Sequence, residues 1–514
     1  MTETEAVVEK TALKEEHANA HDMKLTPLII IQQVASLALC AFCVTIVGAL
    51  IFTGNTRVAD ETNPWIALIV CALAVTWLSM IEGCQASLVG LPPVDPVLYK
   101  DSHPITYKIA GMVFSGDNFD RFLMGRQFMV LLVVFVINQC GAPLDPKVDV
   151  LGLPEGVKFV FLDIGLAMLI FTAILGQLHT EINASYCMIA FVNNYFAYFT
   201  VFTALCIEKM GILHSAYLIK DFLGAVTGKP IITNEPPKKG AVFLFYWGRV
   251  IMSLAILGFC CAIILASLFQ GKSMITVKHP NISNGLSVVL LLIFMTIIGI
   301  LEGTQIAYFS VAKLTKADRE KGYLATKTSE ILFDGTGVNL PGFMVGRQLT
   351  VCGNFFLVGS ICSLNIIPGT GNNIFGVSDG AQEFLNFGFQ GAVTTTILAS
   401  LIWRYTASAF PFPFINNPIS FGLMLFAIGL NNSGLCHGAW VIARVVKKIT
   451  GLQYDEVYVG TPEERAANNH PDKDLTPEQD VGHLHGTHFM GHLCGSHDPL
   501  DGPTKSKDPI DAAA

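Results

Sequence analysis

The hydrophobic positions of this chain form long runs that are separated by polar segments. A helix needs about twenty mainly apolar residues to cross the hydrocarbon core of a bilayer, so these runs predict membrane-spanning helices. About ten such segments follow: 27–52, 65–82, 126–140, 157–178, 186–207, 243–269, 286–301, 347–367, 385–403 and 419–443. We therefore expect an all-α polytopic membrane protein.

The composition agrees with this prediction and excludes several classes of protein. Of the 514 residues, 52% are hydrophobic and 14% are charged, whereas soluble domains contain about 25% charged residues. A soluble enzyme, a nucleic-acid binder and a disulfide-stabilised secreted domain are therefore excluded. Because no catalytic motif is evident, we expect no enzymatic activity, no catalytic residues, no required cofactor and no nucleic-acid partner.

The net charge of −8 belongs to the end of the chain. Residues 451–514 hold twelve Asp and Glu against four Lys and Arg, which accounts for the whole surplus. The charge is therefore no guide to a substrate. Five regions are expected: a polar N-terminal tail (1–26), a first membrane repeat (27–225), a linker (226–241), a second membrane repeat (242–448) and an acidic, His-containing C-terminal tail (449–514).

The membrane region contains an internal duplication. Five short motifs recur in the same order, 220 to 223 residues later. They are Ile81–Gln85 and Leu301–Gln305, Gly125–Gln127 and Gly346–Gln348, Phe161–Gly165 and Phe384–Gly388, Phe191–Asn194 and Phe414–Asn417, and Gly211–Ala216 and Gly434–Ala439. Matched motifs in matched order indicate two copies of one structural unit.

The number of spans in each copy predicts how the two copies are related. Five spans are an odd number, so the second copy enters the membrane the other way up, as two inverted five-helix repeats. A sixth span around His214 would make the repeats parallel, but Lys220 and Asp221 interrupt that segment. Inversion places the matching basic loops on opposite faces, so the positive-inside rule does not settle orientation. Both termini are expected on one side, in the cytoplasm.

Each copy supplies one E-G-x-Q motif and one G-R-Q motif. A helix presents positions three apart on one face, and the Arg side chain offers five hydrogen-bond donors in a rigid fork. The expected substrate-binding residues are Glu82, Gln85, Arg126, Gln127, Glu302, Gln305, Arg347 and Gln348. This set is formally neutral and suits an uncharged polyhydroxylated solute. The alternative is that the Glu–Arg pairs only fasten helix ends together.

Paired E-G-x-Q and G-R-Q motifs resemble those of the silicon transporters of diatoms and related algae. The resemblance covers residues 27–448 and all four motifs. It implies sodium-coupled import of silicic acid, Si(OH)4, with the eight residues above lining the path. Many diatom members end in a coiled coil, whereas residues 451–514 contain Pro, Gly and His without heptads. A coiled-coil partner is therefore not expected.

Other polar residues in apolar segments are candidates for ion coupling. An Asp within a span is a candidate for sodium or proton binding, and amide oxygens at a broken helix can bind sodium. The candidates are Asp163, Asn193, Asn194, Asn416 and Asn417, with helix–helix hydrogen bonding as the alternative role. Glu181 and its repeat mate Arg404 are further candidates for an ion pair that gates the path.

The C-terminal tail contains His483, His485, His488 and His492. Such a tract could bind zinc, or it could be a polar tail without a metal. The expected function is a sodium silicic acid symporter of the plasma membrane, or of an intracellular vesicle, that works by alternating access. The rival hypotheses are a carrier for boric or germanic acid, a passive channel or uniporter, and a membrane sensor that signals through the tail.

Overall fold

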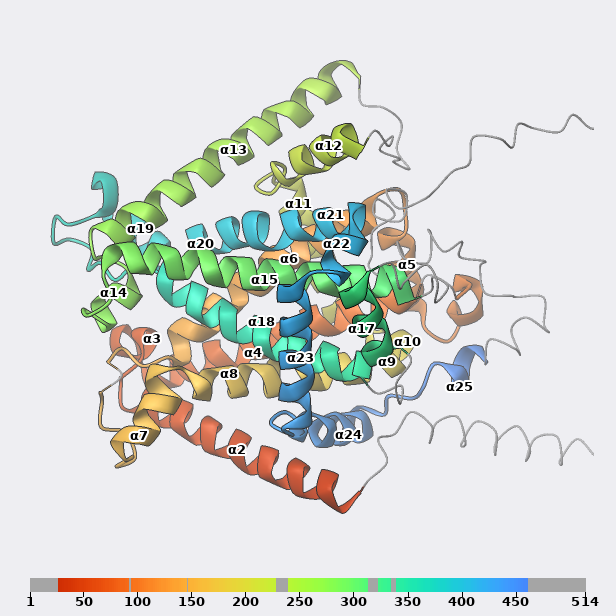
Figure 1. The fold of residues 1–514 in the computed structure, drawn as a ribbon, viewed down its shortest axis with the longest axis horizontal. Helices are drawn as coiled ribbons and strands as arrows, with labels where there is room; N and C mark the ends of the chain where they lie inside the picture. The colour runs from red at the N-terminus through yellow and green to blue at the C-terminus, as the bar shows by residue number, and fades with distance from the viewer. Residues whose placement is uncertain are drawn as a thin grey trace, which may run out of the picture.

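The computed structural model describes residues 26–91, 94–145, 147–227, 239–312, 322–333 and 339–460. Within these ranges the chain forms helices and no strand, as expected for an all-α membrane protein (Figure 1). The candidate metal ligands His483 to His492 lie outside the described residues, as do most of both predicted tails and of the predicted linker.

The helices fall into a first half and a second half. The first half comprises α2 (Pro27–Phe52), α3 (Arg57–Glu61), α4 (Pro64–Gly90), η1 (Pro96–Tyr99), α5 (Pro104–Val113), α6 (Asn118–Gly141), α7 (Glu155–Lys158), η2 (Phe159–Asp163), α8 (Leu166–Thr172), η3 (Ala173–Leu178), α9 (His179–Tyr186), α10 (Met188–Phe191), α11 (Tyr195–Lys209) and α12 (Ala216–Thr227). The second half comprises α13 (Gly240–Phe269), α14 (Met274–Lys278), α15 (Asn284–Ala312), α17 (Tyr323–Leu332), α18 (Asn339–Cys362), η4 (Ile374–Gly376), α19 (Asp379–Asn386), α20 (Phe389–Thr394), η5 (Thr395–Leu401), α21 (Ile402–Ala409), α22 (Pro411–Ile415), α23 (Pro418–Asn432) and α24 (Gly438–Thr450). A short helix, α25 (Glu456–Val459), follows.

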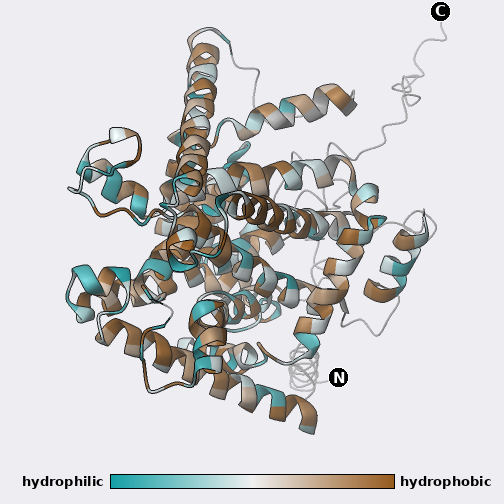
Figure 2. Cartoon of the chain, turned by 60° about the vertical axis from the view of Figure 1, so that its left-hand side comes forward, coloured by the Kyte–Doolittle hydropathy of each residue, from teal (hydrophilic) through white to brown (hydrophobic). Residues whose placement is uncertain are grey.

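Several of these helices have the dimensions of membrane spans. Among the described residues, five helices are long and apolar enough to cross a membrane, namely α2, α4, α6, α13 and α15. Two bent pairs raise the number to as many as seven. Large apolar side chains such as Leu28 and Ile31 on α2, and Leu244 and Phe245 on α13, face outward, and both helices are largely hydrophobic in Figure 2. An outward apolar surface is what lipid contact requires.

Equivalent helices of the two halves run in the same direction. Arg57, just after α2, donates from Nη1 to the carbonyl oxygen of Leu364, just after α18, at 3.2 Å. Lys278, which follows α13, donates to the carbonyl oxygen of Pro143, which follows α6. The ends of α2, α6, α13 and α18 therefore meet at one end of the molecule, which we name the Arg57 end (Figure 1). The predicted inversion of the second copy is wrong.

The predicted inversion fails because the fifth expected span of each half does not cross. Asn193, just before α11, bonds the start of α5, and Lys209, at the end of α11, accepts from Arg249 in the first third of α13. Helix α11 thus begins and ends toward the side opposite the Arg57 end, which we name the Asn193 end. Helix α23 lies across α18 (Figure 1), and its last residue, Asn432, accepts from Gln32 near the start of α2. Segments 186–207 and 419–443 are therefore not spans.

The bent spans break at matched glycines. Gly165 separates η2 from α8 with φ +85°, and Gly388 separates α19 from α20 with φ +91°. The two bends are 49° and 52°. A left-handed backbone conformation favours glycine because a Cβ is strained there. About two helical turns after its glycine, each span contains a π-helical segment, η3 in the first half and η5 in the second. Such segments are frequent at functional sites.

The glycine of each G-R-Q motif is needed for helix packing. A Cβ at Gly125 on α6 would overlap the carbonyl oxygen of Ala204 on α11. A Cβ at Gly346 on α18 would overlap the carbonyl oxygen of Ala427 on α23 in the same way. Both crosswise helices therefore rest directly on the backbone of the helix that carries the following Arg and Gln.

Candidate functional site

The motifs of both halves line one cavity of about 460 Å³. Helices α4 and α6 contribute the first set and α15 and α18 the second. All eight residues predicted for substrate binding are present: Glu82, Gln85, Arg126, Gln127, Glu302, Gln305, Arg347 and Gln348. The repeated motifs thus identified groups that share one cavity, and their part in substrate binding stays a prediction.

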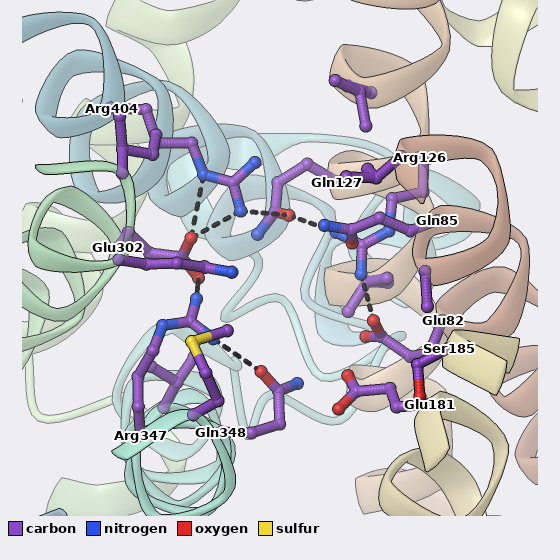
Figure 3. Close-up of a pocket in the computed structure, with 18 of the residues that line it drawn as sticks. Glu82, Gln85, Arg126, Gln127, Glu181, Ser185, Glu302, Arg347, Gln348 and Arg404 are labelled. Carbon is purple, nitrogen blue, oxygen red and sulfur yellow. Dashed lines mark hydrogen bonds and ion pairs between the residues drawn. The ribbon is translucent and has the colours of Figure 1, made fainter. Parts of the chain in front are cut away.

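In the first half, Glu82 holds the motif residues together. Its carboxylate forms an ion pair with Arg126 and accepts from Nε2 of Gln177 at 3.3 Å. Arg126 also donates to Oε1 of Gln127 at 2.9 Å. The Arg fork therefore joins the carboxylate of α4 to the amide beside it on α6 (Figure 3).

In the second half, Glu302 has two arginine partners. Nη2 of Arg347 lies 3.0 Å from Oε1 of Glu302, and Nε of Arg404 donates to Oε2 at 2.8 Å. Arg347 donates to Oε1 of Gln348 at 2.9 Å, as Arg126 does to its neighbour. Arg404 also reaches across to Oε1 of Gln127 at 3.4 Å, so the two motif sets are connected (Figure 3).

These charged side chains are deeply buried. Glu82 and Glu302 are each 2% exposed, and Arg126 and Arg347 are each 4% exposed. An isolated charge in such a place is very unfavourable, whereas a paired and hydrogen-bonded charge is tolerated. Removing one partner of a buried pair costs about 3–5 kcal/mol. The pairs therefore constrain the four helices and leave the amides of Gln85 and Gln305 on the cavity wall.

The glycine of each E-G-x-Q motif faces an aromatic ring. A Cβ at Gly83 would overlap the ring of Phe191, and one at Gly303 would overlap the ring of Phe414. Phe191 and Phe414 belong to another of the repeated motifs. Recurrence of both glycine contacts shows that the duplicated motifs are also packing units.

The four candidate asparagines hold helix ends. Oδ1 of Asn193 accepts from the backbone NH of Ile105 at 3.1 Å, and Oδ1 of Asn416 accepts from Leu324 at 3.1 Å. Asn194 caps α11, and Asn417 caps α23. Backbone NH groups thus already occupy these amide oxygens, which gives the asparagines a structural role. Their predicted ion binding stays a prediction.

The candidate Asp163 lies at the Arg57 end, away from the cavity. Its Oδ1 is 3.2 Å from Nε2 of His279, so a first-half carboxylate faces a second-half imidazole. Its repeat mate Asn386 donates to the carbonyl oxygen of Ile366 at 2.8 Å. Asp163 therefore contributes to the contact between the halves, and its predicted part in ion coupling stays a prediction.

Side chains of both halves pack on the Arg57 side of the cavity, and a second cavity adjoins it on the Asn193 side. On the Arg57 side of the cavity, the ring of Phe135 packs against Gly359, Gly388 and Gly391 of the second half. Toward the Asn193 end, a second cavity of about 350 Å³ adjoins it, because both are lined by Ile182, Tyr186 and Trp440. The halves also touch at the Asn193 end, where Nδ2 of Asn183 donates to the carbonyl oxygen of Ala443 at 3.0 Å.

Other charged and polar residues at or beside the cavity lie outside the motifs; Gln177, Glu181 and Arg404 are examples. Gln177 binds Glu82, Arg404 binds Glu302, and Glu181 lines the cavity. In this structure Arg404 pairs with Glu302 of its own half. The sequence carried a signal for the last two, because they occupy the same position of the two copies. Gln177 gave none, since its mate is Ser400.

Comparison with known proteins agrees with the motifs. No curated protein and no solved structure matches the chain. A family model described as Silicon transporter matches residues 24–513, nearly the whole chain. With both motif pairs complete and gathered around one cavity, the chain belongs to the silicon transporter family.

Proposed function

We propose that the protein imports silicic acid by sodium-coupled symport and that the cavity of about 460 Å³ is its binding site. Membership of the family implies silicic acid transport. The observation that carries the proposed site is the convergence of both motif sets on one cavity. Four carboxamides there can donate and accept, which suits an uncharged solute with several hydroxyls. The volume leaves room for water beside such a solute.

Alternating access is supported by the arrangement of the halves. Parallel repeats related by an axis along the membrane normal allow one half to rock against the other around a central site. Hydrogen bonds from Arg57 and Lys278 link the halves at the Arg57 end in this structure. Opening that end requires Arg57 and Lys278 to leave the carbonyl oxygens that they bind.

The direction of the repeats also bears on orientation. Because equivalent loops share one end, their basic residues add up at the Asn193 end; Lys100, Lys108 and Lys327 are examples. Arg444, Lys447 and Lys448 of α24 lie there as well. Basic loops stay preferentially in the cytoplasm. We therefore place the Asn193 end in the cytoplasm and the Arg57 end outside, with the plasma membrane as the proposed location.

The test is uptake of silicic acid into proteoliposomes with and without an inward sodium gradient. Sodium-dependent accumulation is expected for the wild-type protein. Glu82→Gln and Glu302→Gln are expected to reduce it, whereas Glu330→Gln, which alters an exposed ion pair on α17, is not. Flux that only equilibrates, whatever the sodium gradient, would indicate a channel or uniporter. Equal uptake by all three variants would exclude the proposed site.

A further inference from the structure

The second cavity, of about 350 Å³, has a basic wall. Three cationic side chains of α24 line it, those of Arg444, Lys447 and Lys448, and no Asp or Glu is among its described lining residues. The three residues are three or four positions apart or adjacent, so they lie on one face of the helix. A cavity that gathers positive charge without a carboxylate favours an anion.

The acidic residues that follow the cavity in sequence do not neutralise its wall. Asp455 and Glu456 come directly after the lining residue Tyr454, yet neither lines the cavity. The carboxylate oxygens of Asp455 accept from the backbone NH groups of Met188 and Ile189, each at 2.9 Å. Asp455 therefore fastens the chain to the start of α10.

Two of the basic side chains keep charge available for a ligand. Arg444 donates from Nη2 to Oε1 of Gln33 at 2.9 Å and from Nε to the carbonyl oxygen of Trp440 at 3.4 Å. Both acceptors are uncharged, and the guanidinium has five N–H donors in all. Lys448 is exposed and makes no hydrogen bond or ion pair with the described part of the chain. Neither cation is therefore paired with a carboxylate there.

The basic end of α24 lies where a span enters the membrane. The backbone NH of Gly438, at the start of α24, donates to Oγ of Ser36 at 2.9 Å, whereas Arg444 contacts Gln33. Helix α24 therefore proceeds toward the start of α2 (Pro27–Phe52), beside which it lies in Figure 1. Its last two turns carry the basic residues, at the level expected for lipid headgroups.

Exposed apolar side chains accompany the charges. On α24, Val445 is 51% exposed and Ile449 is 78% exposed, and on α2 Leu28 and Ile31 face outward. A helix with basic side chains beside exposed apolar ones suits the boundary between headgroups and acyl chains. A free phosphate would use the charges alone, whereas a phospholipid uses both, so the surface fits a lipid better.

We propose that Arg444 and Lys448, together with Lys447, bind the phosphate of an anionic phospholipid in the leaflet at the Asn193 end. The Arg fork matches the geometry of phosphate oxygens. Anionic lipids are concentrated in the cytoplasmic leaflet, so the source of the lipid agrees with the proposed orientation. Binding itself does not depend on which solute is carried. Because the two cavities share lining residues, the headgroup would lie next to the cavity that the motifs line.

The test is the melting temperature of the purified full chain, titrated with dioctanoyl phosphatidylglycerol, dioctanoyl phosphatidylcholine or inorganic phosphate at equal ionic strength. A lipid that binds only the folded protein raises the melting temperature, and the titration gives its apparent affinity. Phosphatidylglycerol is expected to act at lower concentration than the other two. Arg444→Gln and Lys448→Gln should each weaken its affinity about fivefold, and the double variant about thirtyfold.

Three variants keep the proposal open to refutation. Lys448→Gln guards against loss of folding, because Lys448 is exposed. Lys327→Gln removes an exposed charge at the same end but outside this cavity and should keep the full affinity. Ile449→Ser should weaken phosphatidylglycerol binding, because it removes apolar surface from the lipid side.

Three outcomes would overturn the proposal. Equal responses to phosphatidylglycerol and phosphatidylcholine would show that the charge of the headgroup is not recognised. Full affinity in the double variant would place the lipid elsewhere. A response to inorganic phosphate as strong as that to phosphatidylglycerol, and unchanged by Ile449→Ser, would indicate a site for a soluble anion and not for a lipid.

Discussion

The two halves of the molecule have the same packing but different charges. Both use a motif glycine to seat a crosswise helix, both bend a span at a left-handed glycine, and both cap the same helix ends with paired asparagines. At one matched position, however, the first half has Glu181 and the second has Arg404. Duplication therefore preserved the framework that forms the cavity, while exchanged side chains, of which this pair is one, gave its two walls different charges.

The largest effect is expected where the halves are most alike. Gly125→Ala and Gly346→Ala should each prevent folding or lower stability by about 3 kcal/mol or more, because the new Cβ overlaps a backbone carbonyl that cannot move alone. Gly48→Ala on α2 is the matched control, since nothing lies within 4 Å of its Cβ. Yield of monodisperse protein and melting temperature measure the effect. A clear difference between Gly125→Ala and Gly346→Ala would break the equivalence of the halves.

The next largest effect is a loss of uptake, and it should differ between Glu82 and Glu302. Glu302→Gln leaves two arginines without their carboxylate, whereas Glu82→Gln leaves one. Loss of a buried partner costs roughly 2–5 kcal/mol, and 1.4 kcal/mol corresponds to a factor of ten. We expect uptake to fall about a thousandfold for Glu302→Gln and about a hundredfold for Glu82→Gln. Initial uptake rates, normalised to protein in the liposomes, would show whether the order is reversed.

A smaller effect on uptake is expected when Glu302 is left with a single arginine partner, as Glu82 is in the first half. Arg404→Gln leaves Glu302 paired with Arg347, as Glu82 is paired with Arg126, and removes one positive charge from the cavity. Uptake should then fall by about three- to tenfold, less than for Glu302→Gln, because one charged hydrogen-bond partner is lost while Arg347 keeps Glu302 paired. Initial uptake rates, normalised to protein in the liposomes, measure it. A fall as large as that of Glu302→Gln would contradict the secondary role of Arg404.

The smallest effect concerns the two contacts that close the Arg57 end. Their acceptors, the carbonyl oxygens of Leu364 and Pro143, lie at matching places after α18 and α6, but the donor is Arg57 at the start of α3 in one contact and Lys278 at the end of α14 in the other. Burial lowers the pKa of Lys278 to about 8, although Asp163 and Asp145 oppose the shift. The folded state thus binds fewer protons than the unfolded state between about pH 8 and the ordinary lysine range, so stability from this group rises with pH there.

The difference in melting temperature between the wild-type protein and Lys278→Gln should therefore rise by about 1–2 °C from pH 8 to pH 10. Arg57→Gln should show no such change against the wild-type protein, because a guanidinium stays charged. Parallel pH profiles for the wild-type protein and Lys278→Gln would contradict the buried, proton-linked contact.

Much of the site could be read from the sequence because its residues are repeated. Glu82 and Arg126 are 44 positions apart, yet their mates keep nearly the same spacing, which pointed to two helices that present them together. The roles of Asn193 and Asn416 could not be read in this way. An asparagine that caps a helix and one that binds an ion have the same local sequence, and only the position of the neighbouring backbone NH groups distinguishes them.

The direction of the repeats could not be read from hydropathy either. Segments 186–207 and 419–443 are as apolar as real spans, but α11 and α23 have only 15 helical residues each. They lie across α6 and α18 on glycines, and their outer faces carry exposed apolar side chains such as Phe199 and Phe426. Apolar composition indicates that a segment avoids water, but it does not indicate the angle at which the segment crosses its neighbours. With one span fewer in each half, the span count becomes even, and the two copies are then predicted to be parallel and not inverted.

The sequence by itself determined the all-helical membrane class, the duplication and the eight motif residues, because long apolar runs require a bilayer and the same polar residues recur within them in both copies. Only the tertiary structure decided that the copies run in the same direction, that Arg404 binds Glu302, and that Glu181 and Gln177 keep unused oxygens beside Glu82. Those outcomes depend on distances between side chains far apart in the chain. Such distances follow from how helices pack and bend, which local sequence does not encode.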